Sequence, residues 1–422
     1  MNAVVVGGGK MGLPLACVLA KNGASVTVCD ASSNTVEKIN AGICPFEEEG
    51  VGELLAENVS AGRLKATMET TQAVSAASFV IVIVPVLLTD ENKADLSIIV
   101  SVAEAIANGL KPGTTVSFET TLPVGTTRSF IPILETGGLK AGTDFHLVFS
   151  PERVKSRSVL AHLTKIPKIV GGLTPACRKA GEEFYGKYLG APVAGVGSLE
   201  ASEFAKVGGM VYRDVSIALA NELGWYAKQL GIDFREMIRV TNTDGEANLL
   251  TPGIGVGGHC TPVYPYFYIN DAIDKAIPSR LAQLSRQIND AQPGECVAML
   301  EQVIGNLSGQ EVLIMGLGFR PGVKEHTMSP AFLVQGELAR RGAKATLCDP
   351  MYTGEELRRL GFEPDSGKAV AAILVTNHEE FRALSPDWYK QHGITSIVDG
   401  RGALDAGELE RANIRVLSIF GG

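Results

Sequence analysis

One cysteine stands in a stretch whose residues could do covalent chemistry. The segment 255–267 reads GVGGHCTPVYPYF, in which a glycine-rich turn leads to Cys260 and two prolines follow. Because proline interrupts helices, we expect no helix to follow the cysteine at once. A thiol in this place is either a small buried filler or a nucleophile that a substrate must reach. The rest of the sequence has to decide between these two interpretations.

The composition limits the classes of function. A chain of 422 residues predicts two or three domains, and 45% hydrophobic with 20% charged residues is ordinary for a soluble globular protein. A net charge of -8 without a Lys/Arg block argues against nucleic acid as a partner, whereas a small anionic substrate needs only local positive groups. Gly and Pro interrupt the apolar N-terminus, which also lacks a basic region, so we expect neither a secretory signal nor a membrane span.

The seven cysteines are scattered along the chain without CxxC pairs and without His/Cys metal spacing. This pattern is typical of reduced thiols and predicts neither a disulfide framework nor a metal site. We therefore expect a cytoplasmic protein that binds no membrane and no nucleic acid.

The first thirty residues carry the pattern of a dinucleotide-binding unit. The run AVVVGG predicts a buried strand, Gly7-x-Gly9-x-x-Gly12 follows, the next segment has helical apolar spacing, and the strand SVTVCD ends in Asp30. Such glycines let a pyrophosphate approach the backbone at a helix N-terminus, and the acid accepts from a ribose diol. Because Asp30 would repel a 2′-phosphate, NAD is favoured over NADP. The alternative is a glycine turn that holds no ligand.

Further elements must position these residues. The segments 77–86 and 114–127 are predicted to contain later strands of the same sheet, with their ends at the carboxyl edge where ligands bind. Apolar spacing from about 198 to 230 predicts one long helix, weakened at Gly208-Gly209, and a helix of that length suits a spacer and a dimer interface. A further helical pattern begins near 279.

The strand and glycine theme returns after residue 310. The segment EVLIMGLG is followed by a helical pattern and by the strand-like runs ATLCDP, AAILVT and SIVDG. We interpret this as a second, degenerate doubly wound unit. The predicted fold class is therefore α/β, with two Rossmann-like doubly wound parallel-sheet domains joined by a long central helix.

In their order along essentially the whole chain, these motifs resemble the UDP-glucose/GDP-mannose dehydrogenase family of nucleotide-sugar 6-dehydrogenases. The similar blocks are GGGKMGLPLA, GICPFEEEGVGELL, ETTLPVGTT, FSPERV, EFAKVGGMVYRDVSIALANE, GVGGHCTPVYPYF, MGLGFRP and VTNHEEF. The GGHC form followed by Pro262 is most similar to the branch acting on UDP-N-acetylhexosamines such as UDP-N-acetylmannosamine or UDP-N-acetylglucosamine. The resemblance implies an NAD-binding domain at 1–196, a central dimerisation and catalytic-cysteine region at 197–295, and a nucleotide-sugar-binding domain at 296–422.

The resemblance also implies a role for Cys260. In this family a hydride passes from C6 of the sugar to NAD, and the cysteine adds to the resulting aldehyde as a thiohemiacetal. Loss of a second hydride leaves a thioester, which water hydrolyses to the uronic acid. Flexible glycines beside the thiolate suit this chemistry, because the backbone can approach the sugar and N–H groups can support developing charge.

The matched blocks imply further site residues. Lys206 matches the lysine that holds the C6 oxygen, Glu152 matches the glutamate that moves protons through water, and Arg320 stands where a lysine contacts the phosphates. The bland alternatives are a solvated helix lysine and a surface salt bridge. The implied cofactor-binding residues are Gly7, Gly9, Lys10, Met11, Gly12, Asp30, Val84, Pro85, Glu119 and Thr121. The implied substrate-binding residues are Glu152, Arg153, Lys206, Gly255, Gly257, Gly258, Phe319 and Arg320.

Four matched positions depart from the family. Met210 replaces an asparagine that joins the lysine on the C6 oxygen, and Tyr264 replaces an aspartate of the CxPxD block. Glu246 falls where an arginine reaches the partner subunit's substrate, and Thr327 falls where an arginine contacts NAD. Glu325 keeps the charge of an aspartate. Loss of a proton-transfer partner or an oxyanion donor typically costs about 10²–10⁴ in rate.

These departures leave several hypotheses open. The first is an NAD-dependent oxidation of a nucleotide sugar to the uronic acid by a homodimer or higher homo-oligomer. The second keeps the dehydrogenase but lets it stop at the aldehyde or act on a related nucleotide or nucleoside. The third is a non-catalytic paralogue that binds a sugar nucleotide. A simpler hydroxyacid dehydrogenase is disfavoured, because it would have no need for Cys260.

Overall fold

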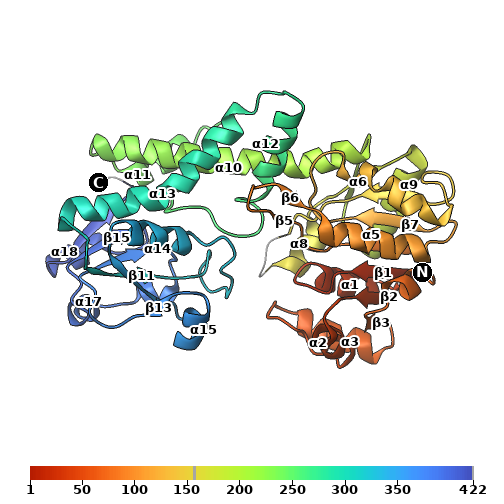
Figure 1. Ribbon diagram of the computed structural model, residues 1–422, viewed down its shortest axis with the longest axis horizontal. Coiled ribbons are helices and arrows are strands. Elements are labelled where there is room, and N and C mark those ends of the chain that lie inside the picture. The colour runs from red at the N-terminus through yellow and green to blue at the C-terminus, as the bar shows by residue number, and fades with distance from the viewer. Residues whose placement is uncertain (155–157, 421–422) are drawn as a thin grey trace. The chain divides into compact units, whose positions relative to one another are not determined.

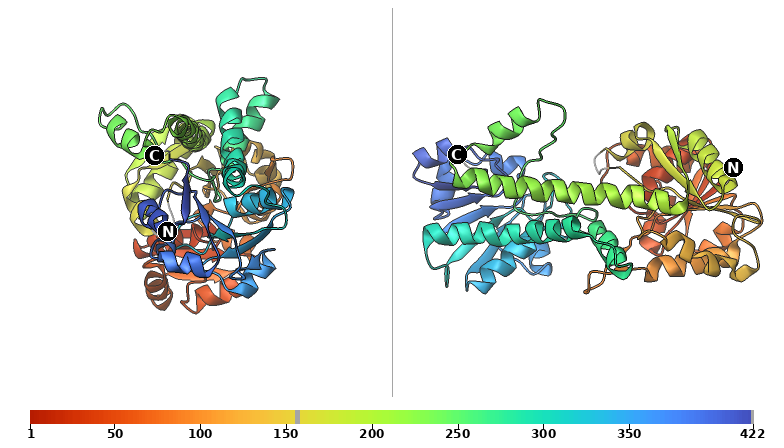
Figure 2. Two further views of the ribbon diagram at one scale, coloured as in Figure 1. Left: turned by 90° about the vertical axis from the view of Figure 1, so that its left-hand side faces the viewer. Right: turned by 90° about the horizontal axis from the view of Figure 1, so that it is seen from above.

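The chain forms two compact units in a computed structural model that describes residues 1–154 and 158–420. The first unit contains Met1–Gly209 and Tyr266–Lys275, and the second contains Met210–Pro265 and Ala276–Gly422. Helix α10 (Leu199–Gln229) joins them and runs unbroken through its two central glycines (Figure 2). The predicted long central helix is thus present.

The first unit is built on an eight-stranded sheet, drawn in red to yellow-green in Figure 1. In sheet order its strands are β10 (Val193–Val196), β9 (Lys168–Gly172), β8 (His146–Phe149), β7 (Thr115–Phe118), β4 (Phe79–Val82), β1 (Asn2–Val6), β2 (Ser25–Cys29) and β3 (Leu64–Thr67). Six of them follow the doubly wound order 3-2-1-4-5-6, with the switch point between β1 and β4.

One pair in this sheet departs from the predicted parallel arrangement. Strand β9 runs antiparallel to β8, with Phe149 opposite Gly171, and β10 then pairs with β9 in parallel. The connection from β8 to β9 therefore starts and ends at the same edge of the sheet. That edge is the carboxyl edge of the six parallel strands, so the first residue of β9, Lys168, lies where their loops begin.

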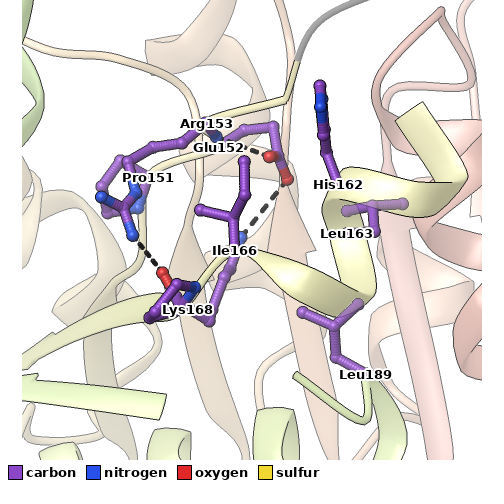
Figure 3. Close-up of a pocket in the computed structure, with 9 residues that line it drawn as sticks. Pro151, Glu152, Arg153, His162, Leu163, Ile166, Lys168 and Leu189 are labelled. Atoms are coloured by element: carbon purple, nitrogen blue, oxygen red, sulfur yellow. Dashed lines mark hydrogen bonds and ion pairs between the residues drawn. The ribbon is translucent and has the colours of Figure 1, made fainter. Parts of the chain in front are cut away.

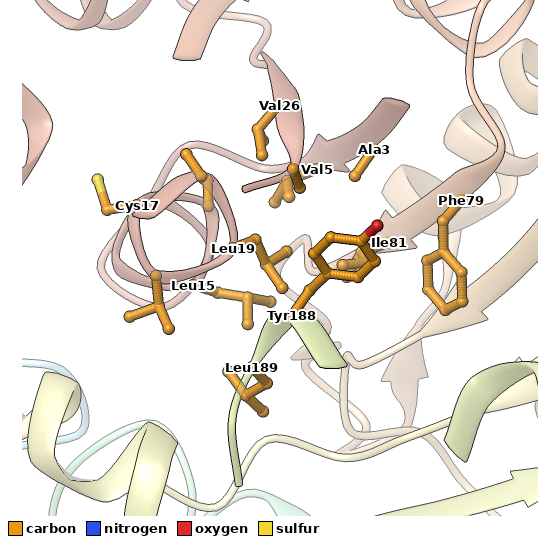
Figure 4. Packing of buried hydrophobic residues seen from close by; sticks show 14 of the residues in the cluster. Ala3, Val5, Leu15, Cys17, Leu19, Val26, Phe79, Ile81, Tyr188 and Leu189 are labelled. Carbon is orange, nitrogen blue, oxygen red and sulfur yellow. The ribbon is translucent and has the colours of Figure 1, made fainter. Parts of the chain in front are cut away.

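Helices cover both faces of the first sheet. Helix α1 (Gly12–Lys21) is buried along nearly its whole length because almost every residue is apolar. Its Leu15 and Leu19 belong to one core cluster with Val5 of β1, Ile81 of β4 and Tyr188 of α9 (Figure 4). The other helices here are α2 (Ser33–Asn40), α3 (Val51–Ser60), α4 (Thr70–Val74), α5 (Ser97–Gly109), α6 (Thr126–Ser129), α7 (Ile131–Leu134), α8 (Val159–Lys165) and α9 (Pro175–Tyr188). A small hairpin pairs β5 (Leu87–Leu88) with β6 (Ala94–Asp95).

The second unit contains a six-stranded sheet that is parallel throughout. In sheet order its strands are β13 (Glu363–Pro364), β12 (Lys344–Cys348), β11 (Glu311–Met315), β14 (Ala371–Leu374), β15 (Ser396–Asp399) and β16 (Arg415–Ser418). This is again the order 3-2-1-4-5-6, so the predicted α/β fold class is confirmed. Its helices are α11 (Phe234–Thr241), α13 (Arg280–Ile304), α14 (Pro330–Arg340), α15 (Gly354–Arg359), α16 (Glu379–Arg382), α17 (Pro386–Gln391) and α18 (Ala406–Arg411).

A buried polar network ties α10 to α13 within the second unit. Asp214 is fully buried and accepts hydrogen bonds from Arg286 at 2.6 Å, Asn289 at 2.8 Å and Ser285 at 3.2 Å. The second guanidinium nitrogen of Arg286 pairs with Asp290. Because buried charges are tolerated only when they are paired and hydrogen-bonded, this network fixes how the two long helices pack.

The expectation that no helix follows Cys260 at once is wrong. Helix α12 (Tyr264–Asp274) begins four residues beyond the cysteine. Pro265 is its second residue, in the first turn, where a backbone N–H has no partner inside the helix and its loss costs nothing. No helix in the described part of the chain is long and apolar enough to cross a membrane.

Candidate functional site

The glycine turn after β1 has the shape of a phosphate cradle. Gly7 has a φ of +113°, and a Cβ on Gly12 would lie 1.9 Å from the Gly7 carbonyl oxygen, so neither position tolerates a side chain. A Cβ on Gly9 would meet nothing within 4 Å, which leaves open space directly in front of the turn. Lys10 and Met11 follow and lead into α1. These residues fit the pyrophosphate of a dinucleotide.

Asp30 completes this cradle at the end of β2. Its carboxylate accepts hydrogen bonds from the backbone N–H of Gly8 and of Ser32, both at 2.9 Å. The acid thus holds the glycine turn while remaining partly exposed. A partly exposed carboxylate in this place fits a ribose diol, as the sequence predicts.

The loops after β4 and β7 meet beside this turn. Val84 and Pro85 follow β4, and the hydroxyl of Thr120 donates to the Val84 carbonyl at 2.7 Å. Thr121 is 5% exposed. The structure therefore brings the predicted cofactor-binding residues to the carboxyl edge of one sheet, on both sides of its switch point.

Glu119 points into the interior instead of toward solvent. Its side chain is fully buried, with one carboxylate oxygen 2.6 Å from Lys168 Nζ and the other accepting from the Tyr185 hydroxyl at 2.7 Å. The Tyr185 oxygen also lies 2.8 Å from the Ser117 hydroxyl. Lys168 Nζ lies 3.5 Å from a carboxylate oxygen of Glu152 as well. One ammonium group thus serves two carboxylates (Figure 3 shows its contact with Glu152).

The titration of this cluster follows from its burial and charges. Burial raises the pKa of Glu119, against the opposing attraction of Lys168. Burial lowers the pKa of Lys168, but the two neighbouring carboxylates outweigh it and leave that pKa raised. Burial, and then the charge of Glu119, hold the pKa of Tyr185 well above its usual range. Lys168 is therefore a cation and Tyr185 a neutral hydrogen-bond donor at physiological pH.

The first turns of α10 are anchored along one face. Ser202 donates to the carbonyl of Phe149, and Glu203 accepts from the backbone N–H of Thr127 at 2.8 Å and of Gly125. One turn further on, Lys206 is 8% exposed and its ammonium donates to the carbonyl of Glu152. The helix thus places Lys206 beside Glu152.

The second unit carries the glycine loop of Cys260. The thiol residue is exposed, which excludes its interpretation as buried filler. A Cβ on Gly257 would lie 2.5 Å from the Cβ of Phe319, and one on Gly258 3.0 Å from the Phe319 ring, so only glycine lets the loop pack on this aromatic side chain. Gly258 also has a φ of +98°, a region that favours glycine.

Polar contacts hold the same loop on both sides of the thiol. The N–H of Gly258 donates to the carbonyl of Thr327 at 2.8 Å, and His259 Nε2 lies 2.7 Å from a carboxylate oxygen of Glu325. The backbone N–H of Tyr264 donates to the carbonyl of Cys260 at 2.9 Å. Hydrogen bonds and an ion pair therefore hold the turn that carries the exposed cysteine.

Arg320 follows Phe319 and carries an unused donor. Its Nε is buried and has no hydrogen-bond partner among the described residues. A buried guanidinium donor without a partner is costly, so the site fits an anionic ligand that would satisfy it. Gly255, predicted in the same substrate set, packs against Pro330.

The departing residues occupy varied settings. Met210 is half-buried on α10, and Glu246 is exposed in the loop after α11, where its N–H donates to Asp244 at 2.8 Å. Tyr264 is the first residue of α12, and the carbonyl of Thr327 holds the cysteine loop. Thr327 contacts the cysteine loop through its backbone carbonyl, so this contact does not depend on the type of its side chain.

Sequence reasoning missed several residues of these sites. Lys168 and Tyr185 complete the carboxylate cluster, and Arg401 lies beside the start of the cysteine loop, with Nη1 2.8 Å from where a Cβ on Gly253 would be. Burial lowers the pKa of Arg401 to about 10. The one available signal in the sequence was Lys168, at the start of the strand-like run KIVGG. A charged group at the start of a buried strand needs a partner, so its position indicates an acidic residue nearby.

All seven cysteines are free, and Cys260 differs from most of them in its exposure. Burial raises the pKa of Cys17 and of Cys296 to about 12 and that of Cys29 to about 11. These buried thiols are poor nucleophiles. Among the residues that the structure describes, no group of three or more His, Cys, Asp or Glu side chains could hold a metal ion.

Comparison with known proteins identifies the family. Residues 1–189 match the NAD-binding domain of the UDP-glucose/GDP-mannose dehydrogenase family, residues 200–291 its central domain, and residues 313–406 its UDP-binding domain. The chain belongs to this family. The predicted membership is thereby confirmed, as are the predicted dehydrogenase class and NAD as cofactor.

The similarity to curated relatives covers nearly the whole length of this chain. It is 31% identical to the NDP-N-acetyl-D-galactosaminuronic acid dehydrogenase of Ralstonia nicotianae, covering 95% of this chain and 96% of the relative. It is 30% identical to the UDP-N-acetyl-D-mannosamine dehydrogenase of Pyrococcus horikoshii, covering 95% of each. The solved structure of the Pyrococcus horikoshii UDP-D-ManNAc dehydrogenase superposes with a TM-score of 0.90, at 27% identity and 99% coverage of both chains.

Proposed function

We propose that this dehydrogenase oxidises C6 of a UDP-N-acetylhexosamine to the uronic acid, with NAD accepting both hydrides. The relatives named above act on N-acetylated sugars, which supports this substrate class. The single observation that carries the proposal is Cys260, an exposed thiol on a rigid glycine loop in a chain whose other thiols are mostly buried. Two successive oxidations need such a group to hold the aldehyde as a thiohemiacetal and then a thioester.

Each unit contributes its own groups to the proposed reaction. Lys206 stabilises the negative charge that develops on the C6 oxygen, and Glu152, to whose carbonyl it donates, receives protons. In the second unit, Arg320 binds the phosphates of the sugar nucleotide with its unsatisfied donor. The cradle of Gly7, Gly9 and Gly12, with Asp30, binds the dinucleotide.

A second candidate is a dehydrogenase that stops at the aldehyde or uses a related substrate. It is favoured by Tyr264, the first residue of α12, which occupies the position of the aspartate in the family's CxPxD block. A phenol cannot take a proton at neutral pH as a carboxylate does. The hydrolytic half of the reaction would then be the weakened one.

The deciding experiment is the yield of NADH per sugar nucleotide at completion. The substrates are UDP-N-acetylmannosamine, UDP-N-acetylglucosamine, UDP-glucose and GDP-mannose, and the product is identified by mass spectrometry. Two NADH and the acid from an N-acetylated sugar are expected. One NADH and an aldehyde would favour the second candidate. NADH from none of the four would contradict the first candidate and leave, of the second, only a substrate outside this set. Lys206→Ala and Cys260→Ala serve as controls for dependence on the named site.

We further propose that the chain acts as a cytoplasmic homodimer through α10. Tyr212, Leu219 and Tyr226 recur at seven-residue intervals on this helix and are 64%, 49% and 65% exposed. An apolar stripe of this kind is typical of an interface. Size-exclusion chromatography with light scattering should give a dimer, and Tyr226→Glu should give monomers. A monomeric native chain at micromolar concentration would contradict the proposal.

A further inference from the structure

The carboxylate cluster of the first unit contains an ammonium group that the proposed function leaves without a role. Lys168 is 5% exposed and is the first residue of β9. Because β9 runs antiparallel to β8, in a register that sets Phe149 opposite Gly171, the chain returns to the level of Glu152, three residues beyond β8. The antiparallel direction of β9 therefore places the Lys168 ammonium next to Glu152.

The contacts around Lys168 are asymmetric. Its Nζ lies 2.6 Å from Glu119 and 3.5 Å from Glu152, and 5.1 Å from the centre of the Tyr185 ring. The other oxygen of Glu152 accepts from the backbone N–H of Val154 at 3.0 Å. Glu119 is fully buried, whereas the Glu152 side chain is 13% exposed. Of the two carboxylates, Glu152 is the one that a water molecule can reach.

A small pocket lies on the open side of this carboxylate. Glu152, Arg153, His162 and Lys168 are among its lining residues, and Figure 3 shows them around one hollow. The pocket has room for about one water molecule. The Arg153 guanidinium donates to the carbonyl of Pro167. Glu152 is the carboxylate that lines this hollow.

We propose that Lys168 is a positioning residue that pairs with the Glu152 carboxylate and holds it at this pocket, so that Glu152 can take a proton from water. The proposal rests on the function proposed above. In the hydrolytic step, the water gives its proton to Glu152 and its oxygen bonds to the thioester carbon. The carbon–sulfur bond then breaks, and the sulfur of Cys260 leaves as the thiolate. Glu119 and Tyr185 offset the cost of burying the ammonium.

Other charged or titratable groups face Glu152 from every packed element. Glu119 follows β7, Tyr185 belongs to α9, and Lys206 of α10 donates to the Glu152 carbonyl. Arg153 is its chain neighbour, and His162 of α8 lines the same pocket. Lys168 makes an ion pair with the Glu152 carboxylate.

Three variants test the proposal by their charge. Lys168→Met removes the cation, Lys168→Arg keeps it, and the double variant Lys168→Met/Glu119→Gln removes both charges of the buried pair. The double variant preserves the comparison if an uncompensated Glu119 prevents Lys168→Met from folding. The first readout is the titration of the Glu152 carboxyl by carbon-13 NMR without substrate, with its signal identified by its loss in Glu152→Gln.

Loss of a neighbouring cation favours the protonated acid, so the sign of the effect is fixed. In Lys168→Met, the Glu152 titration should move to higher pH than in the native enzyme. The double variant should show a smaller rise, because the like charge of Glu119 is gone as well, and Lys168→Arg should show almost none. The acid limb of kcat should move to higher pH in the same order. Mass spectrometry of the intact enzyme should show the Cys260 thioester accumulating in Lys168→Met.

Several results would overturn the assignment. An unchanged Glu152 titration in a folded Lys168→Met or double variant would show that the cation does not control this carboxylate. Failure of Lys168→Arg to restore the acid limb would reduce Lys168 to a packing residue. If the native enzyme transferred no hydride from any nucleotide sugar, the proposed function would fail, whereas the NMR titration would still decide the role of Lys168.

Discussion

Asp214→Ala should destabilise the second unit more than any single surface change. The substitution leaves Arg286 as a 3% exposed guanidinium that has lost its partner at 2.6 Å. It also removes one of the acceptors of Asn289 and of Ser285, which keep the main-chain carbonyls of Asp214 and Ala282. Breaking a buried ion pair typically costs about 3–5 kcal/mol, and the surviving pair with Asp290 places our expectation at about 3 kcal/mol. For a unit of this size, the melting temperature should fall by about 6–12 °C.

Urea unfolding followed by tryptophan fluorescence measures this loss directly. The chain has two tryptophans, Trp225 and Trp388, and both belong to the second unit. The matched control is Glu301→Ala on the same helix α13, which removes a 40% exposed carboxylate from its pair with Arg341. Exposed pairs are worth about 0–1 kcal/mol, so the control should unfold almost as the native chain does.

A double substitution distinguishes the cost of leaving the Arg286 charge unpaired from the cost of lost packing. Asp214→Leu with Arg286→Met replaces the ion pair by apolar groups and should recover most of the stability, because no charge is left buried without a partner. An Asp214→Ala variant within about 1 kcal/mol of the native chain would refute this reasoning, as would a double variant no more stable than Asp214→Ala.

Three further predictions concern other parts of the chain. Iodoacetamide should alkylate Cys260 well before Cys296, whose pKa burial raises to about 12, and peptide mass spectrometry would show the order. The hydrogen bond from Arg128 lowers the pKa of Glu200 to about 2. Their pair therefore stabilises the fold above about pH 4.5, and this stabilisation is lost as the pH falls toward 2. Over that range, the urea midpoints of Glu200→Gln and the native chain should converge. Asp30→Ala should weaken NAD binding in calorimetry and reduce the preference for NAD over NADP.

Local sequence patterns predicted most of the architecture. The strand AVVVGG, the glycine turn and Asp30 follow one another within thirty residues, so hydrophobic periodicity and turn chemistry suffice to place them. The same holds for α10, whose apolar spacing persists over 31 residues and outweighs two glycines. An accessible thiol at Cys260 was one of two alternatives from the sequence, and the exposure of this residue in the structure decides between them.

Features that depend on distant pairing were not predictable. Whether β9 runs parallel or antiparallel to β8 depends on the path of the intervening chain, and periodicity is the same in both cases. Lys168 therefore looked like an unremarkable lysine before a buried strand. Its partner Glu119 lies 49 residues away in the chain, and Tyr185, which donates to Glu119, lies 66 residues from that acid. Pro265 led to a similar error. Proline is tolerated in the first turn of a helix, but the sequence did not show that Pro265 lies in the first turn of α12.

The departures from the family pattern are not distributed evenly over the two units. All four belong to the second unit: Met210, Glu246 and Tyr264 lie in the residues that match the family's central domain, and Thr327 lies in those that match its UDP-binding domain. The dinucleotide cradle and the pair of Lys206 with Glu152 belong to the first and are intact. The intact cradle predicts that NAD binds in calorimetry to the chain alone, and replacing Glu246 by Arg should change substrate preference without changing NAD binding.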